Sequence, residues 1–130
     1  MTVLIADNDR AVGGLLGEVL QQAGLEPIHA WDGHEASRLA RRADLRVFVC
    51  DLDMPGRSGL EVLESLRDLP APPPAVVVSG FVTGAVEERL RALPFVREVL
   101  RKPFDLLRFS ATVQRLAGPE RRAEDAAAGG

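Results

Sequence analysis

Residues 46–60 read RVFVCDLDMPGRSGL, and this stretch decides the fold. An apolar run of strand length, residues 45–50, stops at Asp51 and is followed by Asp53 and a turn of Met-Pro-Gly. Ser58 and the glutamate three residues after it have the spacing of a helix capping box. Two carboxylates thus lie where a buried strand ends and before a helix begins, which is where open parallel sheets carry functional side chains.

Four more strands are predicted around this one. Residues 2–6, 75–79 and 96–101 form apolar or β-branched runs, and residues 25–30 alternate between apolar and polar side chains. Pro27 lies in the alternating run and has no N–H to donate to a neighbouring strand. We therefore expect residues 25–30 at an edge of the sheet.

Segments with helical periodicity fill the intervals between the strands. Their alternation with the strands predicts a parallel sheet with helices on both faces. The prolines of residues 70–74 predict a stiff, extended connection that is not helical. The predicted helices are residues 11–23, 32–42 and 58–69, a segment striped by Val82, Val86, Leu90 and Leu93, and residues 105–117.

The first predicted helix has two notable features. Gly13, Gly14 and Gly17 each cost about 1 kcal/mol relative to alanine inside a helix, and the periodicity gives no reason for them. Close approach by a partner helix and drift at tolerant positions are both open explanations. The apolar stripe that we expect to be buried consists of Val12, Leu16, Val19, Leu20 and Ala23.

Composition limits the class of protein. The chain has 130 residues, 46% of them hydrophobic and 27% charged, which is typical of one folded domain. We expect that domain to cover residues 1–118, and residues 119–130, which lack large apolar side chains, to be a flexible C-terminal tail. The net charge of −3 gives no basic field for direct binding of nucleic acid, and no apolar stretch approaches the ~20 residues of a membrane span. With a single cysteine, Cys50, and no signal-peptide pattern, we expect a cytoplasmic protein.

Polar side chains follow four of the predicted strands. If the first and third strands are neighbours about 4.8 Å apart, their terminal acids share one pocket and repel each other. Oxygen ligands without His or Cys favour a hard divalent cation such as Mg²⁺, which can also hold a phosphoryl group. The pattern thus indicates one nucleophilic acid beside acids that hold a metal. The residues concerned are Asp7, Asn8 and Asp9 after the first strand, Asp51 after the third, Ser79 at the end of the fourth, and Lys102 and Pro103 after the fifth.

These motifs have a family resemblance in their order and spacing. IADND, DLDMPGRSGLEVL, SG and KPF follow the first, third, fourth and fifth strands. From about residue 3 to residue 116 the chain resembles the receiver domain of a bacterial two-component response regulator of the chemotaxis-regulator kind. The resemblance implies an α/β flavodoxin-like fold, a doubly wound five-stranded parallel sheet of strand order 2-1-3-4-5 with five helices.

The resemblance also implies roles for single residues. Asp51 matches the phosphoacceptor, which takes a phosphoryl group from a sensor histidine kinase or a phosphotransfer protein. Ser79 and Lys102 match the residues that bind the phosphoryl group, and Lys102–Pro103 matches a peptide bond that is often cis. Magnesium would be held by Asp7, Asn8, Asp51 and the backbone carbonyl of Asp53, with Asp9 either a further ligand or only the N-cap of the first helix.

Further expectations concern partners. Ala11 and Leu15 lie beside the buried stripe of the first helix and would meet the kinase. Phosphorylation would change the surface that a downstream protein binds, and a phosphorylation-dependent homodimer remains open. The domain would not be an enzyme beyond its own phosphorylation and dephosphorylation.

Two residues depart from the family pattern. Asn8 stands where a second acid is usual, so Mg²⁺ should bind more weakly. Val99 stands where an aromatic switch residue is common, which excludes signalling by a rotating ring at that position; Phe81 and Phe95 are candidates to replace it.

Two other functional classes remain open. A pseudo-receiver would bind proteins without being phosphorylated, as Asn8 and Val99 would allow. The DLD motif also resembles the start of a phosphatase of the haloacid-dehalogenase type, which forms an aspartyl phosphate. That family, however, expects its metal-binding acids after the lysine rather than at Asp7 and Asp9.

Overall fold

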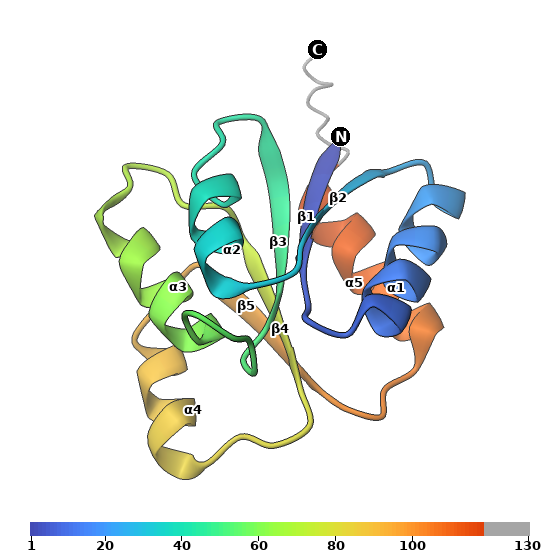
Figure 1. Cartoon of the computed structure of the whole chain (residues 1–130). Coiled ribbons are helices and arrows are strands. Elements are labelled where there is room, and N and C mark those ends of the chain that lie inside the picture. The colour runs from blue at the N-terminus through green and yellow to red at the C-terminus, as the bar shows by residue number, and fades with distance from the viewer. Residues whose placement is uncertain (119–130) are drawn as a thin grey trace.

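The computed structural model describes residues 1–118. It contains a five-stranded parallel sheet of order β2-β1-β3-β4-β5, so the predicted fold class and strand order are confirmed (Figure 1). The predicted tail, residues 119–130, lies outside the described residues. The elements are β1 (Thr2–Ala6), α1 (Arg10–Gln22), β2 (Glu26–Ala30), α2 (Gly33–Leu39), β3 (Leu45–Asp51), α3 (Gly59–Ser65), a 3₁₀ turn η1 (Leu66–Asp68), β4 (Ala75–Ser79), α4 (Gly84–Arg91), β5 (Val96–Arg101) and α5 (Leu106–Ala117).

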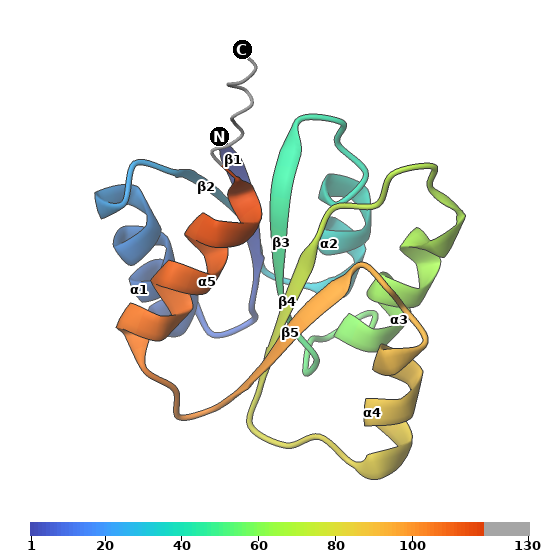
Figure 2. The same cartoon turned by 180° about the vertical axis from the view of Figure 1, so that it is seen from behind.

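Helices cover both faces of the sheet. One face carries α1 and α5 and the other carries α2, α3 and α4 (Figures 1 and 2). Because side chains alternate along a strand, β1 sends Val3 and Ile5 into the core under α1 and α5, and Leu4 and Ala6 into the core on the opposite face. The strands are therefore buried on both sides, which explains their continuous apolar runs. Pro27 lies on β2, an edge strand, as predicted.

Two helices are shorter than their periodicity predicted. The expected helix over residues 32–42 ends at Leu39, and the expected helix over residues 58–69 ends at Ser65 and continues only as the 3₁₀ turn. Their starts are as predicted: Asp32 caps α2, and Ser58 forms the capping box of α3 with Glu61. A side-chain cap marks the start of a helix from nearby residues alone. The end was predicted from the periodicity of the sequence, which continues beyond the last helical hydrogen bond.

The buried face of α1 differs from the predicted stripe. Leu16 and Leu20 are buried as expected, but the rest of the buried face is glycine rather than valine. A Cβ on Gly13 would lie 2.9 Å from Cζ3 of Trp31, and one on Gly17 would lie 2.9 Å from the ring of His29. Val12, Val19 and Ala23 are only half-buried. The face is rotated because the rings of His29 on β2 and of Trp31, the residue after β2, pack against the helix at these glycines.

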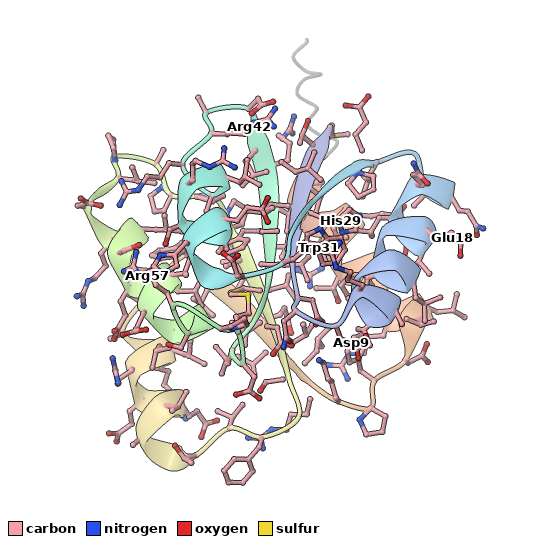
Figure 3. The ribbon with its side chains drawn as sticks, viewed as in Figure 1. Asp9, Glu18, His29, Trp31, Arg42 and Arg57 are labelled. Carbon is pink, nitrogen blue, oxygen red and sulfur yellow. The ribbon has the colours of Figure 1, made fainter. Side chains whose placement is uncertain are left out.

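The two rings form a stack beside α1 (Figure 3). The rings of His29 and Trp31 are 4.9 Å apart at an interplanar angle of 3°, and the guanidinium of Arg10 lies 4.6 Å from the Trp31 ring centroid. Gly13 and Gly17 thus give the stack room to lie flat against the helix. The close approach at Gly13 and Gly17 is made by these two rings of the same chain, and not by the partner helix that the sequence left open.

The two kinds of glycine in α1 should respond oppositely to alanine. Gly17→Ala is expected to lower the free energy of unfolding by about 1 kcal/mol. The added methyl group must displace the His29 ring, and the cost of that displacement exceeds the stability gained from the higher helix propensity of alanine. Gly14→Ala, where no atom lies within 4 Å, should raise the free energy of unfolding by about 1 kcal/mol. Urea unfolding of both variants measures the difference, and equal effects would contradict the packing of α1 on His29.

Candidate functional site

The carboxyl ends of the strands bring the predicted site residues together. In the pairing of β1 with β3, Ala6 lies opposite Cys50, so Asp7 and Asp51 follow at the same level of the sheet. Ser79 is the last residue of β4, and Lys102 comes directly after β5. The parallel order of the strands is thus sufficient to collect these residues at one edge of the sheet.

Lys102 joins the two acids. Its Nζ lies 3.1 Å from Oδ2 of Asp51 and 3.6 Å from Oδ2 of Asp7. Its backbone N–H donates to the carbonyl of Ser79 at 2.8 Å, which fixes the start of the loop, and the Lys102–Pro103 bond is cis. Burial alone would lower the pKa of Lys102, but the hydrogen bond and charge of Asp51 and the charge of Asp7 raise it overall. The ammonium therefore stays charged between the acids.

The Oδ1 atom of each of the two acids accepts a hydrogen bond from a backbone N–H group. Oδ1 of Asp7 accepts the N–H of Asp9 at 2.9 Å, and Oδ1 of Asp51 accepts the N–H of Asp53 at 3.0 Å. Each carboxylate is therefore fixed by a backbone amide two residues further along the chain. This leaves both Oδ2 atoms facing the same small space beside Lys102.

One oxygen of Asp7 has no hydrogen-bond partner. The residue is fully buried, and its Oδ2 has no hydrogen-bond partner, because the Lys102 ammonium at 3.6 Å is beyond hydrogen-bond distance. Burial raises the pKa of Asp7, and the neighbouring charge of Asp51 raises it further; the N–H of Asp9 and the charge of Lys102 act in the opposite direction. A buried carboxylate oxygen without a partner is what a bound cation would satisfy.

The donor set fits a weakly held hard cation. Asp7, Asp51 and the carbonyl of Asp53 are available, and Asn8 can add only a neutral oxygen. Asp9 lies at the start of α1 (Figure 3), where its Oδ1 accepts the N–H groups of Ala11 and Val12 and caps the helix. Within residues 1–118 no group of three or more His, Cys, Asp and Glu side chains is close enough to hold a metal. A small charged donor set is consistent with an ion that keeps several waters, as Mg²⁺ does.

Ser79 is bonded to its own loop rather than to the acids. Its Oγ donates to the carbonyl of Phe81 at 3.1 Å and accepts the N–H of Phe81 at 3.4 Å. The sequence pattern did not indicate this link, because it depends on how the loop turns after β4. The sequence also did not indicate the contact between Gly59 and Asp51. Gly59 packs directly on the backbone of Asp51.

The predicted docking and switch positions lie on the surface. Ala11 and Leu15 are exposed on α1, and Leu15 retains 46% of its surface. Val99 on β5 is 37% exposed. Of the helices in residues 1–118, none has the length and apolar character needed to cross a membrane.

The sequence matches a known family over most of its length. The family model described as the response regulator receiver domain matches residues 3–114. The transcriptional regulatory protein TctD of Salmonella typhimurium (strain SL1344) is 31% identical over 123 residues, which cover 91% of this chain and 54% of that protein. The chain thus spans about half the length of the curated relatives it matches.

Solved structures agree with this match. The receiver domain of Francisella response regulator 1452 superposes with a TM-score of 0.80 at 26% identity, covering 89% of this chain and 95% of that one. The response regulator TrrA of Thermotoga maritima, solved in complex with Mg²⁺-BeF, has a TM-score of 0.75 at 25% identity, covering 88% of this chain and 97% of that one. With the strand order and the Asp7, Asp51 and Lys102 cluster, these matches lead to one conclusion: the chain belongs to the response regulator receiver domain family.

Proposed function

We propose that this receiver domain accepts a phosphoryl group on Asp51 in a reaction that depends on Mg²⁺, and that the modification changes its partner-binding surface. The observation that carries the proposal is the convergence of Asp7, Asp51 and Lys102 at the ends of three strands. A sensor histidine kinase or a phosphotransfer protein would supply the phosphoryl group in the cytoplasm, docking on the exposed side of α1 at Ala11 and Leu15. A downstream protein, or a second copy of the chain, would bind the altered surface.

The transfer itself is a displacement at phosphorus. A carboxylate oxygen of Asp51 attacks the phosphorus of a phosphohistidine, the new O–P bond forms, and the N–P bond breaks with its electron pair left on the imidazole. Lys102, whose ammonium is now paired with Asp51, would move this ion pair to an oxygen of the arriving group. When bound by Asp7, Asp51, Asn8 and the Asp53 carbonyl, Mg²⁺ would supply positive charge beside the phosphoryl oxygens.

The switch needs more than one new contact. Moving a two-state protein from 1:99 to 99:1 takes about 5.5 kcal/mol, and a hydrogen bond to a charged group contributes about 1.5–3 kcal/mol. Ser79 alone is therefore insufficient, and we expect both Ser79 and Lys102 to engage the phosphoryl group. The domain would act as a phosphoacceptor for signalling and would catalyse only its own phosphorylation and dephosphorylation.

Intact-mass spectrometry tests the proposal. Wild-type protein treated with acetyl phosphate and Mg²⁺ should gain the mass of one phosphoryl group, since the small donor needs no kinase. Asp51→Asn should gain none, because the amide is not a nucleophile. Asp68→Asn, which changes an exposed acid on the 3₁₀ turn, is the matched control and should be phosphorylated like the wild type.

The other outcomes are equally definite. No adduct on wild-type protein would contradict the proposal and favour a pseudo-receiver, for which Asn8 and Val99 are the supporting residues. An adduct that persists in Asp51→Asn would place the phosphoacceptor elsewhere. Sustained hydrolysis of phosphomonoesters would favour the phosphatase.

A further inference from the structure

Phe81 is the residue that the proposed chemistry leaves unexplained. It lies two residues after Ser79, and its side chain is 74% exposed although it is large and apolar. Exposed phenylalanine is costly in water. Because its backbone N–H and carbonyl are both bonded to the Ser79 hydroxyl, the position of Phe81 depends directly on where that hydroxyl points.

The Ser79 hydroxyl has only one proton. In this structure that proton is donated to the Phe81 carbonyl at 3.1 Å. A hydroxyl that donates to a phosphoryl oxygen can no longer donate to this carbonyl, since a serine is a single donor. Engagement of a phosphoryl group on Asp51 by Ser79 therefore releases the backbone of Phe81.

A groove lies beside the Phe81 ring. It has a volume of about 260 Å³ between the loop after β3 and the start of α4, and Phe81 itself borders it. Leu52, Leu60 and Val86 supply its apolar lining. The ring already borders the groove, so a small movement of the Phe81 backbone together with a change of side-chain rotamer would bring it inside.

The loop allows motion at Phe81 and restricts it after that. Gly80 is exposed, and a Cβ on it would meet no atom within 4 Å, so nothing packs on that side of the residue before Phe81. Val82 is only 7% exposed, and Thr83 caps α4 through the N–H of Val86. The rearrangement is thus confined to Gly80 and Phe81.

We propose that Phe81 is the aromatic switch of this domain: when Ser79 bonds the phosphoryl group, the Phe81 ring closes into the groove lined by Leu52, Leu60 and Val86. The inference rests on the proposed function of Asp51. It assigns to this loop the conformational signal that Val99, which has no ring, cannot give. This closure would change the surface between α3 and α4: the Phe81 ring would no longer be exposed, and the groove would be filled.

Fluorine NMR of protein labelled with 4-fluorophenylalanine tests this closure. The chain has five phenylalanines, and the Phe81 signal is assigned by its loss in Phe81→Leu. Pockets typically cover 70–90% of an occupant, so broadening of the Phe81 signal by a soluble nitroxide should fall about 2.5- to 7-fold on phosphorylation, from its present 74% exposure. Phe48 and Phe109, both 0% exposed, are internal references whose broadening should stay small throughout.

Ser79→Ala is the variant that tests the coupling through the hydroxyl. Alanine leaves Asp51 in place but has no hydroxyl to exchange between Phe81 and the phosphoryl group. Its phosphorylation should be slower, because Ser79 is one of the groups expected to engage the phosphoryl group. The comparison is therefore made on the fraction of each protein that carries the phosphoryl mass, and in that fraction the Phe81 signal of the variant should respond little or not at all. Mass spectrometry on the NMR samples records the modification directly.

Each outcome has one meaning. An adduct on wild-type protein with an unchanged Phe81 signal overturns the closure and leaves the function of Asp51 intact. Equal protection of Phe81 in wild type and Ser79→Ala overturns the coupling through the hydroxyl. Absence of an adduct on wild-type protein overturns both proposals together.

Discussion

Gly59→Ala is expected to lower the free energy of unfolding by about 3 kcal/mol or more, at the upper end of what overpacking costs. A Cβ at residue 59 would lie 2.1 Å from the carbonyl oxygen of Asp51 and 2.8 Å from the Cα of Leu52. These are backbone atoms of a buried strand and cannot turn aside as a flexible side chain could. The first turn of α3 or the end of β3 must therefore move.

Gly84→Ala is the matched control. Gly59 and Gly84 are both the first residue of a helix, after the N-caps Ser58 and Thr83. A Cβ on Gly84 would meet no atom within 4 Å, so the control should be neutral or more stable by up to about 1 kcal/mol. Urea unfolding of the two variants gives the comparison, and similar stabilities would show that the close approach of α3 to Asp51 is not needed.

The same substitution should impair phosphorylation. A shift of the Asp51 backbone moves its carboxylate away from Lys102, whose Nζ is 3.1 Å from Oδ2. Under conditions where Gly59→Ala is still folded, its phosphorylation by acetyl phosphate should therefore be slower than that of Gly84→Ala. Gly59 in this way links the packing of the core to the geometry of the site.

The sequence predicted the convergence of Asp7, Asp51 and Lys102 better than it predicted where the helices end. Asp7, Asp51 and Lys102 could be placed together because they end strands of a parallel sheet, and the topology decides where strand ends lie. The end of α3 at Ser65 could not be predicted, because apolar residues continue to Leu69 while the chain tightens into a 3₁₀ turn. Periodicity records which side chains are buried and not where helical hydrogen bonding ends.

Contacts between distant segments were also beyond the sequence. Which face of α1 is buried depends on His29 and Trp31, which lie on β2 and directly after it. Without the positions of these rings, nothing in the sequence explained a glycine inside the helix. The bond from Ser79 to Phe81 depends on loop geometry, and nothing in the residues SGF specifies it. In both cases the missing information is the position of a partner rather than the identity of a residue.

Asp7→Asn is expected to stabilise the protein when no divalent cation is present. At pH 7 its free energy of unfolding should rise by about 1–3 kcal/mol, which is the cost of leaving a buried polar atom unsatisfied. The wild-type carboxylate is fully buried with Oδ2 unbonded. An amide at this position carries no charge, and its N–H group can donate to Asp51. If the proposed cation site is correct, it reduces the stability of the domain when no cation is bound.

The pH dependence of this effect has a definite sign. The pKa of Asp7 is raised above its ordinary 3.8, because burial disfavours the charged form. The folded state therefore holds the proton more tightly than the unfolded state does, and wild-type stability falls as the pH rises from 3.8 to the folded pKa. The advantage of Asp7→Asn should be full above that range and absent below pH 3.8. Urea unfolding of both proteins in EDTA across this range measures it.

Magnesium should reverse the order of stabilities. An ion that binds only the folded state stabilises it in proportion to the logarithm of its concentration once the site is occupied. Wild-type protein should therefore gain stability as Mg²⁺ is added, while Asp7→Asn, which lacks a charged ligand, should gain much less. Asp9→Asn separates capping from binding, because asparagine caps a helix as well as aspartate does. If Asp9→Asn keeps the Mg²⁺ response, Asp9 acts as a cap; if Asp7→Asn keeps it in full, the cation does not bind at Asp7.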